Sequence, residues 1–524
     1  MLAPHQGRTA LPSFRLQPDS RVLAERPVPA ARLPARRPRR MTETVPFRTA
    51  CPPAAVCVPR RLIATGLCAL LSACVTPPSS EPPAGAVTAE WSAPLPHGGQ
   101  RSALLAWWSG FDDPLVAALV DAAQRANPTL AQAAARVTES RALAQAAGSA
   151  RWPTLDANAS AVRSRSALPP AGITQTASSA TLDALWEIDL FGAVRQSVAA
   201  AEARADASRA QWHDARVSLA AEVAATYVGL RSCEAVLAVY EQDAASLQQT
   251  ADLVGQKIRA GFDAPANGAL ARASAAEAAN RVAAQRTECE VTLKQLVQLT
   301  AAPEPALREQ LAPQRARLPQ PPSFEVAAVP AAVLSQRPDL AAAERGIAAA
   351  AAEVGVAQAD RYPRLSLSGS IGRASIRSGG QTFDGTTWSF GPGLLMPLFD
   401  GGRRRANVDA AQARYEGAVA AYRERALAAV REVEEALLRL DAAGRRETDA
   451  ERAAQGYGEF LAAAQTQWQV GVGSLLDLEQ ARRAALAANA GLIQVQRERV
   501  SAWVQLYKTV GGAWQADDDT TTTR

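Results

Sequence analysis

The sequence is poor in the residues on which most enzyme sites depend. Its three histidines, His5, His97 and His213, are scattered along 524 residues. No group of cysteines and histidines has the spacing of metal ligands, and no Gly-x-x-x-x-Gly-Lys-Ser/Thr loop is present to cradle phosphates. We therefore expect no enzyme, no metal site and no cofactor.

Proline is absent from two long stretches, residues 193–260 and 403–470, although the chain has 34 prolines. Alanine, arginine, glutamate, glutamine and leucine dominate both stretches, and these residues are strong helix formers. A helix of this length would measure roughly 100 Å. Because such a helix needs neighbours to cover its apolar stripe, the sequence predicts a helical bundle or barrel.

Acidic residues are scarce only at the N-terminus. Residues 1–73 hold 12 of the 56 lysines and arginines but 3 of the 51 acidic residues, so the remainder carries 44 basic and 48 acidic residues. The pI of about 9.0 therefore belongs to a leader and not to a binding face, and we expect no nucleic-acid partner.

The leader has two parts. Residues 1–40 are rich in proline and arginine, and we expect them to be untranslated, with Met41 as the start, or disordered. Residues 41–73 have the layout of a secretory signal peptide, because two arginines precede a short apolar run that is too short to span a bilayer.

The apolar run ends in Leu71-Ser72-Ala73-Cys74, which resembles a bacterial lipobox. That resemblance implies cleavage before Cys74, acylation of this cysteine, and a lipid-anchored tether at 74–105. Val75 in place of aspartate favours the outer membrane. The alternative is an ordinary buried cysteine after an apolar run.

Two further cysteines remain in the mature chain. Cys233 and Cys289 each lie 28 residues from Gly261, so an antiparallel helical hairpin that turns at 261–268 would place them at one height. A disulfide is possible in an oxidising compartment. The alternative is two small packing residues that face different ways.

Strand-like alternation precedes each long helical stretch. In 182–190 apolar residues alternate with charged ones, and 365–371 repeat the pattern more weakly. Each alternating segment belongs to a predicted hairpin. Two hairpins make a poor sheet alone, whereas several copies closing into a barrel would leave no open edge.

The two halves of the chain repeat one plan of helix, hairpin, long helix and return helix. Asn127-Pro128 matches Arg337-Pro338 at a spacing of 210 residues, and Gly261 matches Gly471 at the same spacing, whereas Phe191-Gly192 matches Phe399-Asp400-Gly401 at 208. Near-constant spacing indicates duplication. The predicted boundaries are 106–302 for the first repeat, 303–322 for a proline-rich connector, 323–514 for the second repeat and 515–524 for a disordered tail.

Four motifs in the second half carry a family resemblance. They are Gln336-Arg337-Pro338-Asp339-Leu340, Tyr362-Pro363-Arg364-Leu365-Ser366-Leu367, Leu398-Phe399-Asp400-Gly401-Gly402 and Gly471-Val472-Gly473-Ser474-Leu475-Leu476-Asp477-Leu478. The chain resembles TolC-like outer-membrane factors and, more closely, the lipoprotein outer-membrane channels of RND efflux pumps.

The resemblance implies a mainly α fold with a membrane β-barrel. Three copies would form a periplasmic α-barrel, and each would give four strands to a shared twelve-stranded barrel. The implied partners are the other copies of a homotrimer, a periplasmic adaptor, an inner-membrane RND transporter and outer-membrane lipid. The implied function is a passive conduit for small molecules, anchored in the outer membrane and reaching into the periplasm.

The resemblance also assigns site residues. Asp477, and more weakly Gln480, would form the constriction at the periplasmic tip, although the family often has an acidic residue where Gln480 stands. The turns at Gly261, Gly471 and Gly473 would dock the adaptor. The alternatives are that Asp477 caps the helix starting near Ser474 and that the glycines only make tight turns.

Two other functions remain open. The same fold could serve a type I protein secretion system as its outer-membrane component. A lipid-anchored coiled-coil scaffold without a pore would need no barrel.

Overall fold

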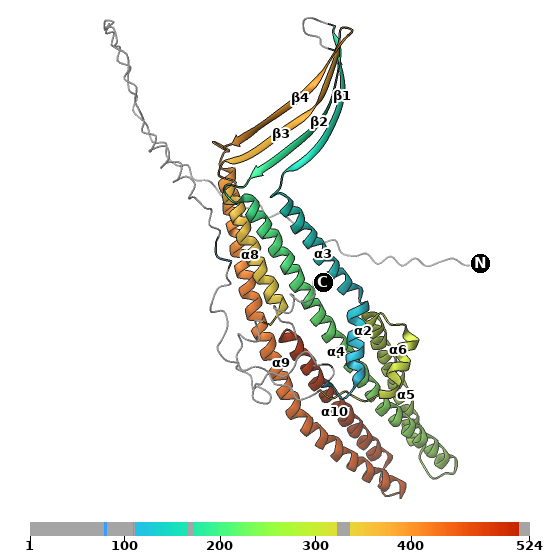
Figure 1. Cartoon of the computed structure of the whole chain (residues 1–524). Helices are drawn as coiled ribbons and strands as arrows, with labels where there is room; N and C mark the ends of the chain where they lie inside the picture. Colours follow the sequence, from blue (N-terminus) through green and yellow to red (C-terminus); the bar gives the residue numbers. More distant parts are fainter. Residues whose placement is uncertain (1–77, 81–107, 109, 166–171, 322–335, 513–524) are drawn as a thin grey trace, which may run out of the picture. The chain divides into compact units, whose positions relative to one another are not determined.

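The computed structural model describes residues 78–80, 108, 110–165, 172–321 and 336–512. The first half contains α2 (Pro114–Ala126), α3 (Pro128–Ser149), β1 (Thr154–Arg165), β2 (Thr174–Ile188), α4 (Ala193–Arg259) and α5 (Pro265–Thr300). The second half contains α8 (Pro338–Ala359), β3 (Arg364–Ser378), β4 (Gln381–Leu395), α9 (Arg403–Gln469) and α10 (Leu475–Thr509). The order helix, hairpin, long helix and return helix therefore occurs twice (Figure 1).

The two long helices confirm the prediction from the proline-free stretches. Both α4 and α9 have 67 residues. Each begins after a glycine in the left-handed region, Gly192 at φ +87° and Gly402 at φ +89°. These two caps are 210 residues apart, so the spacing of 208 that the sequence suggested here is wrong. Two more residues stand between Phe399 and the start of α9 than between Phe191 and the start of α4, so a match on the phenylalanines misses the caps.

The turn between α4 and α5 is shorter than the sequence suggested. The predicted turn at 261–268 ends at Ala264, because Pro265 occupies the first turn of α5, where its missing N–H is no loss. Gly268 is a buried helical residue beside the side chain of Ile258.

The proline-rich stretch between the halves is also helical in part. It holds α6 (Glu304–Leu311) and the short 3-10 helix η3 (Ala312–Gln314). Glu304 and Arg308 on α6 form an ion pair, and Glu304 also binds Lys294 on α5. The segment thus packs on the first repeat.

The four strands form one antiparallel sheet in the order β1-β2-β3-β4. The central pairing joins β2 to β3, so the two predicted hairpins make one sheet. Within the described residues β1 and β4 each have one neighbour and form the two edges.

Helix packing repeats along the chain as the strands do. α4 packs against α5, and α9 packs against α10 in the same way. The side chain of Asn127, before α3, donates to the carbonyl of Leu299, and the guanidinium of Arg337, before α8, donates to the carbonyl of Thr509. Both bonds span 172 residues, which shows the duplication at the level of single contacts.

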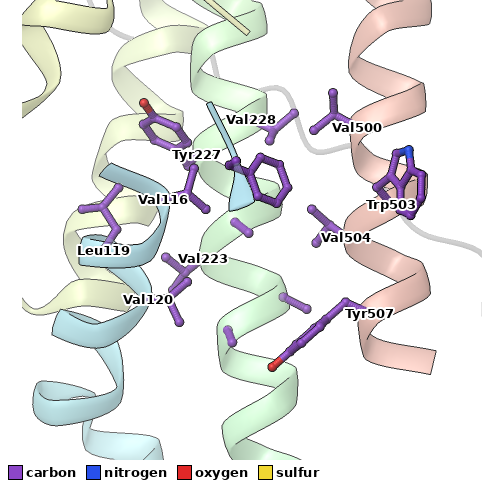
Figure 2. Close-up of a cluster of buried hydrophobic side chains, with 14 of the residues drawn as sticks. Val116, Leu119, Val120, Val223, Tyr227, Val228, Val500, Trp503, Val504 and Tyr507 are labelled. Atoms are coloured by element: carbon purple, nitrogen blue, oxygen red, sulfur yellow. The ribbon is translucent and has the colours of Figure 1, made fainter. Parts of the chain in front are cut away.

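The largest apolar cluster lies where α2, α4 and α10 meet (Figure 2). The labelled side chains are Val116, Leu119, Val120, Val223, Tyr227, Val228, Val500, Trp503, Val504 and Tyr507. The cluster joins residues from both repeats, so burial of apolar surface holds the halves together at this level.

Candidate functional site

The two helical hairpins end in the same backbone turn. At the end of α4 the amide of Gly261 donates to Ile258 and the amide of Phe262 to Lys257. The amides of Gly471 and Val472 repeat these bonds at the end of α9. This is a Schellman motif, which needs a residue at positive φ. Gly261 and Gly471 supply it at φ +79° and +83°.

Gly473 is needed for a different reason. A Cβ atom at this position would lie 3.2 Å from the Cβ atom of Gln467 and 3.2 Å from the amide nitrogen of Trp468. A larger residue would therefore push the chain away from the end of α9. The residues after the glycines, Phe262 and Val472, are 84% and 82% exposed. Each turn thus presents one apolar side chain to its surroundings.

Asp477 forms a capping box with Ser474. The hydroxyl of Ser474 accepts from the amide of Asp477 at 3.1 Å, and the Asp477 carboxylate accepts from the amide of Ser474 at 3.3 Å. The structure thus gives Asp477 the capping role that the sequence left open as the alternative. Its side chain is also exposed, as is that of Gln480 one turn later. A constriction role depends on the assembled channel.

The two hairpins are joined near their tips within one chain. Arg482 on α10 pairs with Glu479 at 3.0 Å and donates to the hydroxyl of Ser246 on α4, also at 3.0 Å. Closer to the turns, the ammonium of Lys257 lies 4.9 Å from the centre of the Trp468 ring. Sequence reasoning missed the contacts of Arg482 with Ser246 and of Lys257 with Trp468, because each joins residues more than 200 positions apart.

Cys233 and Cys289 form a disulfide between α4 and α5, with their Cα atoms 5.5 Å apart. Helix axes are commonly about 8–10 Å apart, but facing residues in a narrow seam approach more closely. This seam is narrow because Ala271, Ala275 and Ala278 line it towards the turn. The side-chain amide of Gln285 also donates, through Nε2, to the Cys233 sulfur at 3.1 Å.

A buried polar cluster fixes the middle of the first repeat. Arg231 is 0% exposed, and its guanidinium donates to Glu234, to the Leu311 carbonyl and to the Tyr227 hydroxyl. Tyr227 in turn donates to the Asp113 carboxylate. Burial raises the pKa of the Tyr227 phenol, and the bond to Asp113 raises it further, so this hydroxyl stays protonated. No sequence motif pointed to Arg231.

In the half of the sheet next to the helices, one face is mainly apolar and the other mainly polar. Successive residues of a strand point to opposite sides, and the register brings like residues of all four strands together. The apolar face carries Leu155, Leu182, Trp186, Leu367, Ile371, Trp388, Phe390 and Leu394. The polar face carries Asp156, Asn158, Asp183, Ser368, Ser370 and Ser389.

The exposure of the apolar face is the strongest functional signal in the sheet. Trp388 is 76% exposed and Phe390 is 71% exposed. An exposed apolar face of this kind marks a contact with lipid or protein. The polar face is suited to water, and on it Asn158 donates to Asp183 at 2.6 Å. A membrane strand shows this two-sided pattern.

Comparison with known proteins agrees with this geometry. The model of the family described as outer membrane efflux protein matches the chain twice, at residues 119–302 and 329–512. The two matches are again 210 residues apart. The chain belongs to the outer membrane efflux protein family.

Individual members of the family are similar over most of their length. The outer membrane protein OprJ of Pseudomonas aeruginosa is 33% identical over 461 residues, which cover 85% of this chain and 94% of OprJ. The toluene efflux pump outer membrane protein TtgI of Pseudomonas putida is 30% identical, covering 86% and 97%. The solved structure of the outer-membrane channel OprN has a TM-score of 0.75 at 29% identity, covering 84% of this chain and all of OprN.

These findings confirm the predicted family, the mainly α fold with a four-stranded sheet, and an outer-membrane efflux channel as the function. The efflux channel is located in the outer membrane and extends into the periplasm. Cys74 and the predicted leader lie outside the described residues.

Proposed function

We propose that three copies of this chain form the passive outer-membrane channel of a tripartite RND-type efflux pump. Small molecules would pass through a water-filled tunnel with little recognition, and the channel itself would perform no chemistry. The energy would come from the inner-membrane transporter, to which a periplasmic adaptor would connect the channel.

The two-faced sheet carries this proposal. Each chain offers four strands and two edges, β1 and β4, that lack a second neighbour in the described part of the chain. An open edge with an apolar face is unstable in a bilayer, because its amides and carbonyls find no water there. Three sheets joined edge to edge would satisfy both edges and enclose the polar faces as a lumen.

The proposed membrane anchor has a second part at Cys74. Acyl chains on its sulfur and on the new N-terminus would add to the barrel's hold on the membrane. Labelling cells with radioactive palmitate should mark the wild-type protein and leave Cys74→Ser unlabelled. Equal labelling of both proteins would refute the lipid anchor.

The hairpin tips are the proposed contact with the adaptor. Phe262 and Val472 project from equivalent turns, so each trimer would present six apolar side chains. Serine at either position should weaken co-purification of a cross-linked adaptor without lowering the amount of channel. Leu427→Ser, an exposed apolar position within α9, serves as the control.

Asp477 is the proposed constriction residue, and its capping role complicates a test. Ser474→Ala removes the cap and keeps the carboxylate, whereas Asp477→Asn removes the charge and keeps an acceptor for the amide of Ser474. A ring of three carboxylates would favour cations. Asp477→Asn should therefore reduce cation selectivity in planar bilayers, and Ser474→Ala should not. Equal effects of the two changes on cation selectivity would show that Asp477 acts only as a helix cap. The same measurement on Gln480→Glu should increase cation selectivity.

One set of measurements tests the main proposal. Purified protein in detergent should have the mass of a trimer by light scattering and should conduct in planar bilayers. Deleting the gene in a strain with its pump intact should raise dye accumulation and drug sensitivity. A trimer without conductance would support the scaffold. A conducting trimer whose loss stops export of a protein and leaves dye accumulation unchanged would support the type I secretion alternative.

A further inference from the structure

The internal duplication shows which surfaces of two neighbouring copies meet. Within one chain, α4 of the first repeat packs against α10 of the second. In a ring of six repeats, the equivalent contact would place α9 of one chain against α5 of the next. Such packing is absent between α9 and α5 within the described residues of a single chain.

If this face of α9 is covered only by a neighbouring copy, the residues of α9 that correspond to the α10-facing residues of α4 should be exposed in a single chain. The structure shows this difference between the two helices. On α4, Ser246 and Lys257 are half-buried and Thr250 is 4% exposed. The positions 210 residues later on α9 are Gly456, Gln467 and Phe460, and all three are exposed. Phe460 is 55% exposed, which is a high value for a phenylalanine on a helix that has a packing partner along its length.

The partner helices of this contact, α10 and α5, show the same difference in exposure. On α10, Leu478, Glu479 and Arg482 are buried against α4. Their counterparts on α5 are Gly268, Ala269 and Arg272, of which Ala269 and Arg272 are exposed. Small alanines continue along this exposed face at 273 and 276. The face is therefore smooth enough to accept large side chains from a partner.

Arg272 is the most informative residue of this set. Its counterpart Arg482 pairs with Glu479 and reaches Ser246. Three residues before Arg272 stands Ala269, whereas Arg482 has its partner Glu479 at that place. Arg272 forms no hydrogen bond or ion pair with any described residue of its own chain. The position equivalent to Ser246 is Gly456. It lies in a shallow, open apolar hollow of about 420 Å³ on the surface of α9, which Ala453, Tyr457 and Phe460 complete.

We propose that Arg272 of one copy inserts into the hollow at Gly456 on α9 of the next copy, between the rings of Tyr457 and Phe460. The absent side chain of Gly456 gives the guanidinium room, and the two rings offer it cation–π contacts. The Ala269 face of α5 covers Phe460. The inference rests on the proposed trimer and adds the residues by which its copies recognise one another.

Cysteine cross-linking tests the contact with an internal calibration. Ser246→Cys with Arg482→Cys reports the contact within one chain, and Gly456→Cys with Arg272→Cys reports the proposed equivalent between chains. A short bismaleimide that joins the first pair inside a monomer should join the second pair into dimers and trimers on denaturing gels.

Gly444→Cys with Arg272→Cys is the matched control. Gly444 and Gly456 are both exposed α9 glycines with open space for a Cβ atom, and they are 12 residues, or roughly 18 Å, apart. This control should yield only monomer. Wild-type protein is sized by light scattering in parallel. A wild-type trimer with no 272–456 product overturns the inference alone, whereas a wild-type monomer overturns the proposed function.

A second measurement covers the case in which the double-cysteine variant fails to assemble. Arg272→Ala and Phe460→Ala should each lower the temperature at which the trimer dissociates on unboiled gels. Because the two side chains would share one contact, the double variant should lose less than the sum of the single losses. Strictly additive losses overturn the proposed pairing.

Discussion

Replacing Arg231 by methionine should destabilise the first repeat more than the loss of an ordinary helix arginine. The methionine fills much of the same space without a charge or a donor, so little cavity forms. The change leaves three acceptors without this partner, namely the Glu234 carboxylate, the Leu311 carbonyl and the Tyr227 hydroxyl.

The magnitude follows from the burial of the cluster. Removing one member of a buried ion pair costs about 3–5 kcal/mol, because the other charge stays in a poor solvent. Glu234 keeps one bond, from the amide of Ala316 at 3.1 Å, which places the expected loss towards the lower end. If the cluster breaks before the unfolding transition state, a loss of about 3 kcal/mol speeds unfolding on the order of 10²-fold.

Unfolding rate is the appropriate readout, since a large membrane protein unfolds irreversibly. The helical circular dichroism signal of protein in detergent is followed at fixed temperature. The control is Arg439→Met on α9, whose side chain is 67% exposed and lies 3.5 Å from Glu435, and it should change stability by less than about 0.5 kcal/mol. Equal unfolding rates for the two variants would refute the reasoning.

Three further predictions concern single positions. Gly471→Ala should lower the unfolding temperature, because alanine at φ +83° costs about 1–2 kcal/mol. Gly444→Ala in the interior of α9 should raise the unfolding temperature, because alanine stabilises a helix by about 1 kcal/mol relative to glycine. Shifts of the same sign for both variants would contradict the turn assignment. In the Cys74→Ser background, exported protein should show no free thiol to a maleimide reagent until it is reduced, and Cys233→Ser should cost about 2–4 kcal/mol in unfolding experiments; free thiols at Cys233 and Cys289 in unreduced protein would exclude the bond. Brominated lipids should quench the fluorescence of Trp388, which is 76% exposed, so Trp388→Phe should reduce the quenched fraction while Trp503→Phe should not; no difference would remove Trp388 from the lipid face.

The sequence was most informative where local chemistry decides the structure. The absence of proline and the helix-forming composition defined α4 and α9 almost to the residue. Asn127-Pro128, a landmark of the duplication in the sequence, stands at the break between α2 and α3, because asparagine caps the second helix and proline opens it. Ser474 marked the start of α10 for the same reason.

The sequence was least informative where distant residues meet. Arg231 looks like any arginine of a surface helix, yet its partners Leu311 and Tyr227 bury it. Alternation predicted strands but not the pairing of β2 with β3, which joins residues nearly 200 positions apart. Proline content indicated a connector but not the helix within it, and α6 forms because a proline in the first turn is compatible with a helix.

Ion pairs join the helices of both hairpins, but in the described part of the chain only α4 and α5 also share a disulfide, which predicts which hairpin moves. At the height of the disulfide in α4 and α5, the residue of α10 equivalent to Cys289 is Arg499. Its guanidinium pairs with Glu447 on α9 at 2.5 Å. Arg446 and Glu498 add a second ion pair between α9 and α10 at 2.6 Å.

An ion pair can exchange its partner for water, whereas a disulfide cannot. Any shift between two packings of the tunnel should therefore displace α9 from α10 and leave α4 against α5. Spin labels placed across each hairpin would report this, because the α9–α10 distance distribution should broaden when the adaptor is added and the α4–α5 distribution should not. Adding reductant should make the distance distributions of the two hairpins more alike. Broadening confined to α4 and α5 under oxidising conditions would refute the argument, since the covalent link would then restrain nothing.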